Sequence, residues 1–363
     1  MGLNTCRSRG LNLANDGLSG STTTLEAILH REFRNRVTDF GLAPDGTPVK
    51  RVEIANGGST AFVMTWGASL QDFRIDGIEY PLVLGSPTLP PYWDPMRYFG
   101  AIVGRVANRI AAGRATLDGE NLTLECNESG RNMLHGGDQG SWAVPWSLVG
   151  YDAHSCQMRV VLPDGQGGFP GAIDLLVTYA LDGNGALSID LAATSNAPTF
   201  CALAHHSYWN LDGRSDVSQH HLKVSADRYL PVDAYGVPTG RPQHVYGTVF
   251  DYHTARPIGA ELDHNFCLNA EQVMQQACTL EAGGLRLDVE TTEPGLQVYS
   301  GKHINTGRAL GLCGAPYGAG AGVALEPQHW PDAPNQPDYP SIVLRPGQVY
   351  RQRSVFRVQR RAG

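Results

Sequence analysis

The sequence predicts an all-β fold whose architecture is a large antiparallel β-sandwich. Three observations support this prediction. Apolar and polar residues alternate with the two-residue period of β-strands along most of the chain. The 43 glycines and 23 prolines are scattered singly, which is typical of many short elements joined by turns. Sustained helical periodicity is missing from the main part of the chain, with residues 269–276 as the one candidate.

The chain of 363 residues divides unevenly into an extension and a main part. Residues 1–36 are polar and lack alternation, a composition typical of disorder. Thr23 and Glu26 have the spacing of a capping box, so a short amphipathic helix is expected near the end of this extension. Since β-sandwiches can exceed 200 residues as one unit, residues 37–360 are expected to form a single folded domain.

Alternating segments identify the expected strands in chain order. They cover residues 48–54, 59–66, 157–162, 175–181, 186–193, 285–292 and 296–300. Asp118 and Gly119 separate two short alternating runs, and residues 182–185 separate two longer ones. Both are strong signals for a hairpin. Consecutive strands are therefore expected to pair antiparallel.

Composition excludes several classes of function. The chain has 28 Lys and Arg against 35 Asp and Glu, without a basic stripe, so no nucleic-acid partner is expected. No apolar run approaches the roughly 20 residues of a membrane span, so no membrane partner is expected. Seven cysteines without a CxxC pair indicate reduced thiols, and no secretory signal is present, which favours a cytoplasmic location. Nucleotide-binding glycine motifs are also missing.

Four segments that lie far apart in the sequence concentrate polar residues. They contain Asn108 and Arg109 in GRVANRI with His135 in NMLHGG, then His206 in HHSYWNL, then Asp263 in LDHNF with Gln297, and finally Glu326 in ALEPQH. Amides, guanidinium and imidazole groups suit hydrogen bonds to hydroxyls, and Glu326 ends an apolar run, where a carboxylate usually has a partner or a task. From spacing alone, a purely structural role stays open for each segment.

Two other kinds of site were weighed on the same residues. His135, His206, Asp263 and Glu326 are competent metal ligands, but none of them has the tight spacing of a metal motif, so no metal is expected. A Ser-His-Asp hydrolase is disfavoured because the GxSxG motif is missing.

In order and context, these motifs resemble those of the aldose 1-epimerases, also called galactose mutarotases. The resemblance runs from residue 39 through all four segments to ALEPQHWPDAPN and leaves only the extension outside. It implies a β-supersandwich whose concave face holds a monosaccharide. It also implies interconversion of the α and β anomers of a free aldose, such as galactose or glucose, without a cofactor.

The resemblance also implies a role for each residue. His206 falls on the general acid, Glu326 on the general base, and His135, Arg109, Asp263, Asn108 and Gln297 on hydroxyl-binding positions. A neighbouring carboxylate is expected to keep His206 protonated. His205, Trp209 and Trp330 depart from the family pattern, and the two tryptophans would alter which sugars fit if they line the cleft.

Three alternatives stay open at this point. A hexose-phosphate mutarotase would need further cations at the pocket rim, for which Arg109 is the one candidate. A glycoside hydrolase or lyase could use Asp263 and Glu326 as its two carboxylates. A non-catalytic sugar-binding module would have no need of both His206 and Glu326. The preferred sugar is open, and a monomer or weak homodimer is expected.

Overall fold

Strands dominate the computed structural model, which describes residues 36–269 and 272–361. The expected extension and its helix lie outside the described residues apart from residue 36, so the proposed domain boundary stays a prediction. Every pairing between named strands is antiparallel, as predicted. Within the described ranges the helical elements are short 3₁₀ turns: Pro90–Tyr92, Ala111–Gly113, Ser141–Ala143, Gln166–Gly168 and Ala333–Asn335.

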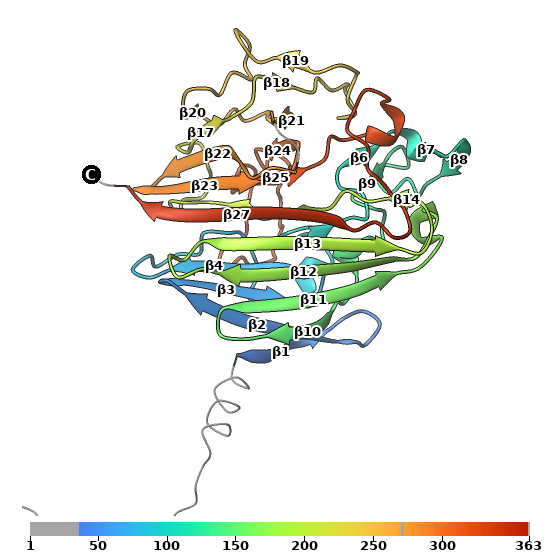
Figure 1. Ribbon diagram of the computed structural model, residues 1–363. Coiled ribbons are helices and arrows are strands. Elements are labelled where there is room, and N and C mark those ends of the chain that lie inside the picture. The colour runs from blue at the N-terminus through green and yellow to red at the C-terminus, as the bar shows by residue number, and fades with distance from the viewer. Residues whose placement is uncertain (1–35, 270–271, 362–363) are drawn as a thin grey trace, which may run out of the picture. The chain divides into compact units, whose positions relative to one another are not determined.

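Three sheets form the body of the molecule (Figure 1). The first has the order β1 (Val37–Leu42), β2 (Pro48–Asn56), β3 (Ser59–Met64), β4 (Ser69–Ile75). The nine-stranded sheet has the order β10 (Ser147–Tyr151), β11 (Ser155–Leu162), β12 (Ile173–Leu181), β13 (Leu187–Ser195), β27 (Tyr350–Arg360), β23 (Leu285–Thr291), β22 (Gln275–Ala282), β17 (His221–Val224), β20 (Arg256–Pro257). The six-stranded sheet has the order β16 (Tyr208–Trp209), β25 (Val323–Gln328), β24 (Gly295–Tyr299), β21 (Asp263–Cys267), β18 (Arg228–Tyr229), β19 (Gln243–His244).

Short two-stranded ladders complete the fold. They pair β5 (Ile102–Val103) with β15 (Ala204–His205), β6 (Arg109–Ile110) with β9 (Met133–Leu134), β7 (Arg114–Leu117) with β8 (Glu120–Thr123), and β14 (Thr199–Phe200) with β26 (Val343–Leu344). The predicted hairpin at residues 118–119 is confirmed between β7 and β8. Asp118 and Gly119 both have positive φ there, as this tight turn requires.

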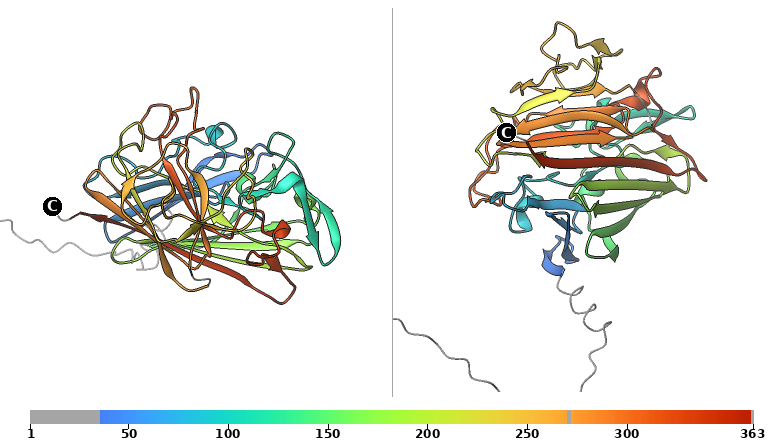
Figure 2. Two further views of the ribbon diagram at one scale, coloured as in Figure 1. Left: turned by 90° about the horizontal axis from the view of Figure 1, so that it is seen from above. Right: turned by 60° about the vertical axis from the view of Figure 1, so that its left-hand side comes forward.

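The main core lies between the nine-stranded sheet and the two smaller sheets. Val52 and Val63 from β2 and β3 share one cluster of buried residues with Val177 of β12 and Val298 of β24. Seen from above, the long strands lie along one side and the remaining strands on the other (Figure 2). Alternation places apolar residues in this core and leaves the opposite face of the six-stranded sheet free for polar side chains.

The helix suggested at residues 269–276 is wrong for the described part of that range, which leaves out residues 270–271. Gln275 and Gln276 begin β22, which pairs with β23 across an irregularity at residues 276–278, and Asn269 lies before it without helical structure. Ala277, Cys278 and Leu280 of β22 are buried in the core. Pairing with the neighbouring strand β23 therefore outweighs the local helix propensity of Gln275 and Gln276.

Candidate active site

A cavity of about 300 Å³ opens on the outer face of the six-stranded sheet. All seven residues singled out in the sequence line it: Asn108, Arg109, His135, His206, Asp263, Gln297 and Glu326. Tyr98, Tyr208, Tyr299 and the loop residues His303–Asn305 contribute further walls. The fold thus brings the four distant polar segments together in one place.

Strand alternation positions the residues on the cavity floor. Leu296 and Val298 of β24 point into the core, so Gln297 between them faces the cavity. Glu326 stands directly opposite Gln297 on β25, and opposed residues of an antiparallel pair share a face. The carboxylate therefore enters the cavity from a fully buried strand.

Two residues in left-handed backbone conformation form the opposite wall. Asn108 has φ 60° and His135 has φ 52°, in the turns that flank the β6–β9 ladder. They are joined by two hydrogen bonds: the His135 N–H donates to the Asn108 carbonyl at 3.0 Å, and the Asn108 N–H donates to His135 Nδ1 at 3.2 Å. Such strained residues persist only where neighbours fix them, and they are frequent at functional sites.

The hydrogen bond to Nδ1 also fixes the chemistry of His135. Burial, His206 and Arg109 hold the pKa of His135 well below its usual range, so the ring is neutral. Since Nδ1 accepts a hydrogen bond, the single ring proton sits on Nε2. His135 is therefore preorganised to donate a hydrogen bond from Nε2.

This tautomer bears on metal binding. The ligand atoms of His135, His206 and Glu326 lie within 4.8 Å of one another, so three potential metal ligands converge. A metal on His135 Nε2 would require the proton on Nδ1, where it would meet the N–H of Asn108. The donor set is thus a poor fit to a metal ion. The absence of a metal from the reaction stays a prediction.

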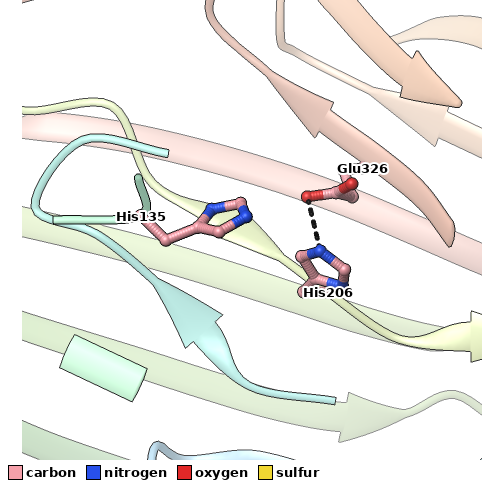
Figure 3. Close-up of side chains that lie close together, drawn as sticks. All are labelled: His135, His206 and Glu326. Atoms are coloured by element: carbon pink, nitrogen blue, oxygen red, sulfur yellow. Dashed lines mark ion pairs between the residues drawn. The ribbon is translucent and has the colours of Figure 1, made fainter. Parts of the chain in front are cut away.

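His206 and Glu326 form the closest acid–base pair of the cavity. His206 Nε2 lies 3.6 Å from Glu326 Oε2. The imidazole rings of His206 and His135 both point toward the carboxylate of Glu326 (Figure 3). Both members of the pair are buried, with side chains 5% and 2% exposed. Burial lowers the pKa of His206 to about 4. Burial and the charge of Asp263 raise the pKa of Glu326 well above its usual value, against an opposing effect of Arg109.

These shifts correct one expectation from the sequence. A carboxylate does lie beside His206, but it does not keep the imidazole charged in the empty cavity. Because burial disfavours both charged forms, it favours the state in which Glu326 carries the proton and His206 is neutral.

Arg109 and Asp263 are each held by a neighbour. Arg109 donates from Nε and Nη2 to the carboxylate of Glu128 at 2.8–3.0 Å, a bidentate arrangement, and Nη1 lies 3.9 Å from Asp263. Asp263 Oδ1 accepts a hydrogen bond of 2.6 Å from Gln297 Nε2. Both groups therefore present fixed polar atoms to the cavity.

The departures from the family pattern do not lie in the cavity. Trp209 is fully buried in the core and stacks on Phe356, and Trp330 donates to the Pro294 carbonyl and packs against Tyr339. His205 is also buried, beside Tyr179. The two tryptophans therefore do not line the cavity, and the condition under which they would alter which sugars fit is not met.

The two glycines of NMLHGG, Gly136 and Gly137, are closely packed against other parts of the chain. A Cβ on Gly136 would lie 2.1 Å from the Gly104 carbonyl, and one on Gly137 would lie 2.3 Å from Glu125. Their lack of a side chain serves the packing of the chain on itself.

Sequence reasoning missed several residues. Glu128 lies in a turn without any signal of its function, and Tyr98 packs against the rings of His135 and His206 from a position outside the quoted motifs. Tyr208 could have been found, since it belongs to HHSYWNL. Arg97 also lines the cavity.

The fold is an antiparallel β-supersandwich, and its polar cavity holds a buried imidazole and carboxylate of the kind that enzymes of acid–base chemistry use. The aldose 1-epimerase family model matches residues 50–357, and the chain belongs to this family. It is an isomerase, an aldose 1-epimerase.

Named relatives agree with this membership. The chain is 38% identical to rat galactose mutarotase over 88% of this chain and 97% of that protein. It is 37% identical to Escherichia coli aldose 1-epimerase over 85% and 95% of the two chains. Among solved structures, the GalM/aldose epimerase homologue from C. elegans superposes with TM-score 0.81 at 30% identity, covering 86% of this chain and 99% of that one. Galactose 1-epimerase from Lactobacillus acidophilus gives 0.79 at 27% identity, covering 90% and 98%.

None of the helices in the described residues is both long and apolar enough to cross a membrane.

Proposed function

We propose that this cavity binds a free aldose, such as galactose or glucose, and that His206 and Glu326 exchange the two protons of its anomer interconversion. The observation that carries the proposal is the buried pair itself, with His206 Nε2 3.6 Å from Glu326 Oε2 in a polar cavity. Burial lowers the pKa of His206 and raises that of Glu326, which favours a pair that shares one proton. Anomer exchange needs one group that takes a proton from the C1 hydroxyl and one that gives a proton to the ring oxygen.

The reaction balances with this single proton. In the reacting complex Glu326 is the carboxylate and His206 the imidazolium. Glu326 takes the O1 proton, the C1–O5 bond breaks, and His206 protonates O5, which leaves an open-chain aldehyde. Rotation about C1–C2 and the reverse transfers close the ring on the other face. Each positioned proton-transfer group contributes about 10²–10⁴-fold to the rate.

While the open-chain aldehyde is bound, Glu326 is protonated and His206 is neutral. That is the same protonation state that burial favours in the empty cavity. Binding of the sugar therefore has to move the proton from Glu326 to His206, and hydroxyls that hydrogen-bond the carboxylate favour this shift. Burial therefore lowers the energy of the complex with the open-chain aldehyde relative to the complexes with the closed-ring sugars.

The remaining residues would hold the sugar hydroxyls. His135 offers its Nε2 proton and Arg109 offers Nη1, which Glu128 leaves free. Asn108 accepts the N–H of Arg109 on its side-chain oxygen, so its amide NH₂ is left as the donor. Asp263 accepts hydroxyl protons while Gln297 fixes its orientation.

A phosphorylated sugar is a weaker candidate. Arg109 is already neutralised by Glu128 and faces Asp263, so a phosphate dianion would meet more carboxylate than cation there. Arg97 adds one cation, but its side chain is 43% exposed and lies 3.5 Å from Asp94. The charges of the cavity favour a neutral sugar.

We also propose a cytoplasmic protein that is a monomer or weak homodimer and has no nucleic-acid or membrane partner. The six cysteines within the described residues are free, in keeping with a reducing compartment. Size-exclusion chromatography with light scattering across a concentration series tests the oligomeric state, and a stable tetramer would contradict it.

Polarimetry on freshly dissolved α-D-galactose and α-D-glucose tests the function, with EDTA and His206→Ala as controls. Faster anomeric equilibration that survives the chelator and is lost in the variant is the expected result. If His206→Ala equilibrates the sugars as fast as the wild type, the acid assignment is wrong. If EDTA abolishes the activity, the metal-free mechanism is wrong.

A further inference from the structure

Two side chains of β27, a strand of the nine-stranded sheet, contact the backbone near both members of the acid–base pair. Gln352 Nε2 donates to the carbonyl of Pro327, the residue directly after Glu326, at 2.9 Å. The Tyr350 hydroxyl donates to Gln352 Oε1 at 2.8 Å and accepts the Leu203 N–H at 3.3 Å. Leu203 lies three residues before His206.

These contacts form one continuous chain of hydrogen bonds. It runs from the Leu203 N–H through Tyr350 and Gln352 to the Pro327 carbonyl, and it uses both polar atoms of the Gln352 amide. Gln352 is 4% exposed, so water does not compete for its amide. Burial raises the pKa of Tyr350 well above its usual value, which keeps the hydroxyl protonated as a donor.

The segment around Glu326 has few other backbone supports. β16 pairs with β25 at Val323 and Ala324 only. Among the described residues, the second half of β25 is therefore hydrogen-bonded to one strand, β24. The contact from Gln352 adds a second support at Pro327, beside Glu326. The same chain of bonds reaches the backbone before His206.

We propose that Tyr350 and Gln352 form a positioning clamp that sets the spacing of His206 and Glu326 for proton transfer. This proposal rests on the proposed roles of that pair. Neither clamp residue lines the cavity, so they act through the two backbone segments and not through the sugar. A displacement of 1 Å at a reacting group can cost about 100-fold in rate.

The clamp predicts a specific pattern for Tyr350→Phe and Gln352→Met, which remove polar atoms at nearly constant volume. We expect kcat to fall about tenfold, while KM for α-D-galactose stays near the wild-type value. Loosening of the two segments also admits water around His206 and raises its pKa toward the usual value. The acid limb of the kcat/KM–pH profile, which reports the free enzyme, should therefore move to higher pH.

Ser354→Ala is the matched control. Ser354 lies on the same face of β27, is 3% exposed, and shares a 2.9 Å hydrogen bond with Thr291 of β23, away from the cavity. This variant should lose a comparable amount of thermal stability but keep the wild-type kcat and pH profile. Melting temperatures of all three variants, measured by calorimetry, make the comparison quantitative.

Three outcomes would overturn the proposal, and they are distinguishable. If the wild type is active and His206→Ala is inactive, but both clamp variants keep the wild-type kcat and pH profile, the clamp alone is wrong. The clamp is also wrong if Ser354→Ala changes kcat and the acid limb as much as they do. If His206→Ala and Glu326→Gln are both fully active, the roles of the pair fail first.

Discussion

One cluster of imidazole and carboxylate groups in the cavity and another on the surface hold their protons in opposite ways. On the surface, His253 contacts Asp227 from Nε2 and Asp251 from Nδ1, both at 2.9 Å, and its side chain is 32% exposed. In the cavity, the pair of His206 and Glu326 is almost fully buried.

Burial accounts for the difference. Hydrogen bonds to Asp227 and Asp251 raise the pKa of His253, and the bond to His253 lowers the pKa of both carboxylates, so these bonds favour the charged form of all three groups. In the cavity, desolvation outweighs attraction and the charges are lost. In the exposed cluster the carboxylates hold the proton on the imidazole, whereas in the buried neutral pair the proton can be transferred.

The largest expected effect comes from Glu326→Gln, which removes the transferable proton. Because an amide cannot accept the O1 proton, kcat for α-D-galactose should fall by about 10²–10⁴-fold. Polarimetry measures it. Near-wild-type turnover would show that the pair in the cavity does not exchange protons with the sugar.

The pH profile of the wild type tests the state of the pair. Activity needs one proton on the pair, so it is lost at low pH when His206 also becomes protonated and at high pH when Glu326 loses its proton. The acid limb of kcat/KM, which reports the free enzyme, is expected near pH 4, the value to which burial lowers the pKa of His206. An acid limb near the pKa of about 6.5 typical of free histidine would contradict the buried neutral pair.

Asp263→Asn should shift this profile. The negative charge of Asp263 raises the pKa of Glu326 and also that of His206, so both limbs of kcat/KM should move to lower pH when the charge is removed. KM should rise as well, since Asp263 is expected to accept sugar hydroxyls. Asp227→Asn, on the surface, serves as the control and should leave both limbs in place.

The smallest effect is expected for His253→Gln, on stability alone. Since the folded pKa of His253 is raised, its stabilising contribution is fully present below the unfolded pKa of about 6.5 and is lost as the pH rises through the folded value. The variant should melt slightly below the wild type at pH 5.5 and together with it at pH 9. A difference that persists unchanged at pH 9 would mean that His253 acts through packing.

The sequence was a good guide where periodicity reports burial. Alternation located β12, β13, β23 and β24, because each of them has one face in the core. It misjudged residues 269–276, because Gln275 and Gln276 begin a strand that pairs with β23 across the tight turn at residues 283–284. The pattern within a segment contains no information on its partner strand.

The candidate site was predictable as a set of residues but not as a chemical environment. Each motif contains some of the polar side chains, and the fold brings them together. The bidentate partner Glu128, the tautomer of His135 and the proton on Glu326 depend on three-dimensional contacts and on desolvation. The same limit explains why Trp209, a cleft candidate by motif, lies in the core.

The direct pairing of Gln297 with Glu326 has a consequence for how such a protein can change in evolution. A one-residue insertion or deletion in β24 would turn Leu296 or Val298 into the cavity and Gln297 into the core. The strand residues of the site can therefore vary by substitution only. His303–Asn305, which line the cavity from an irregular loop, can vary in length as well, so new sugar preferences have their easiest route through that loop.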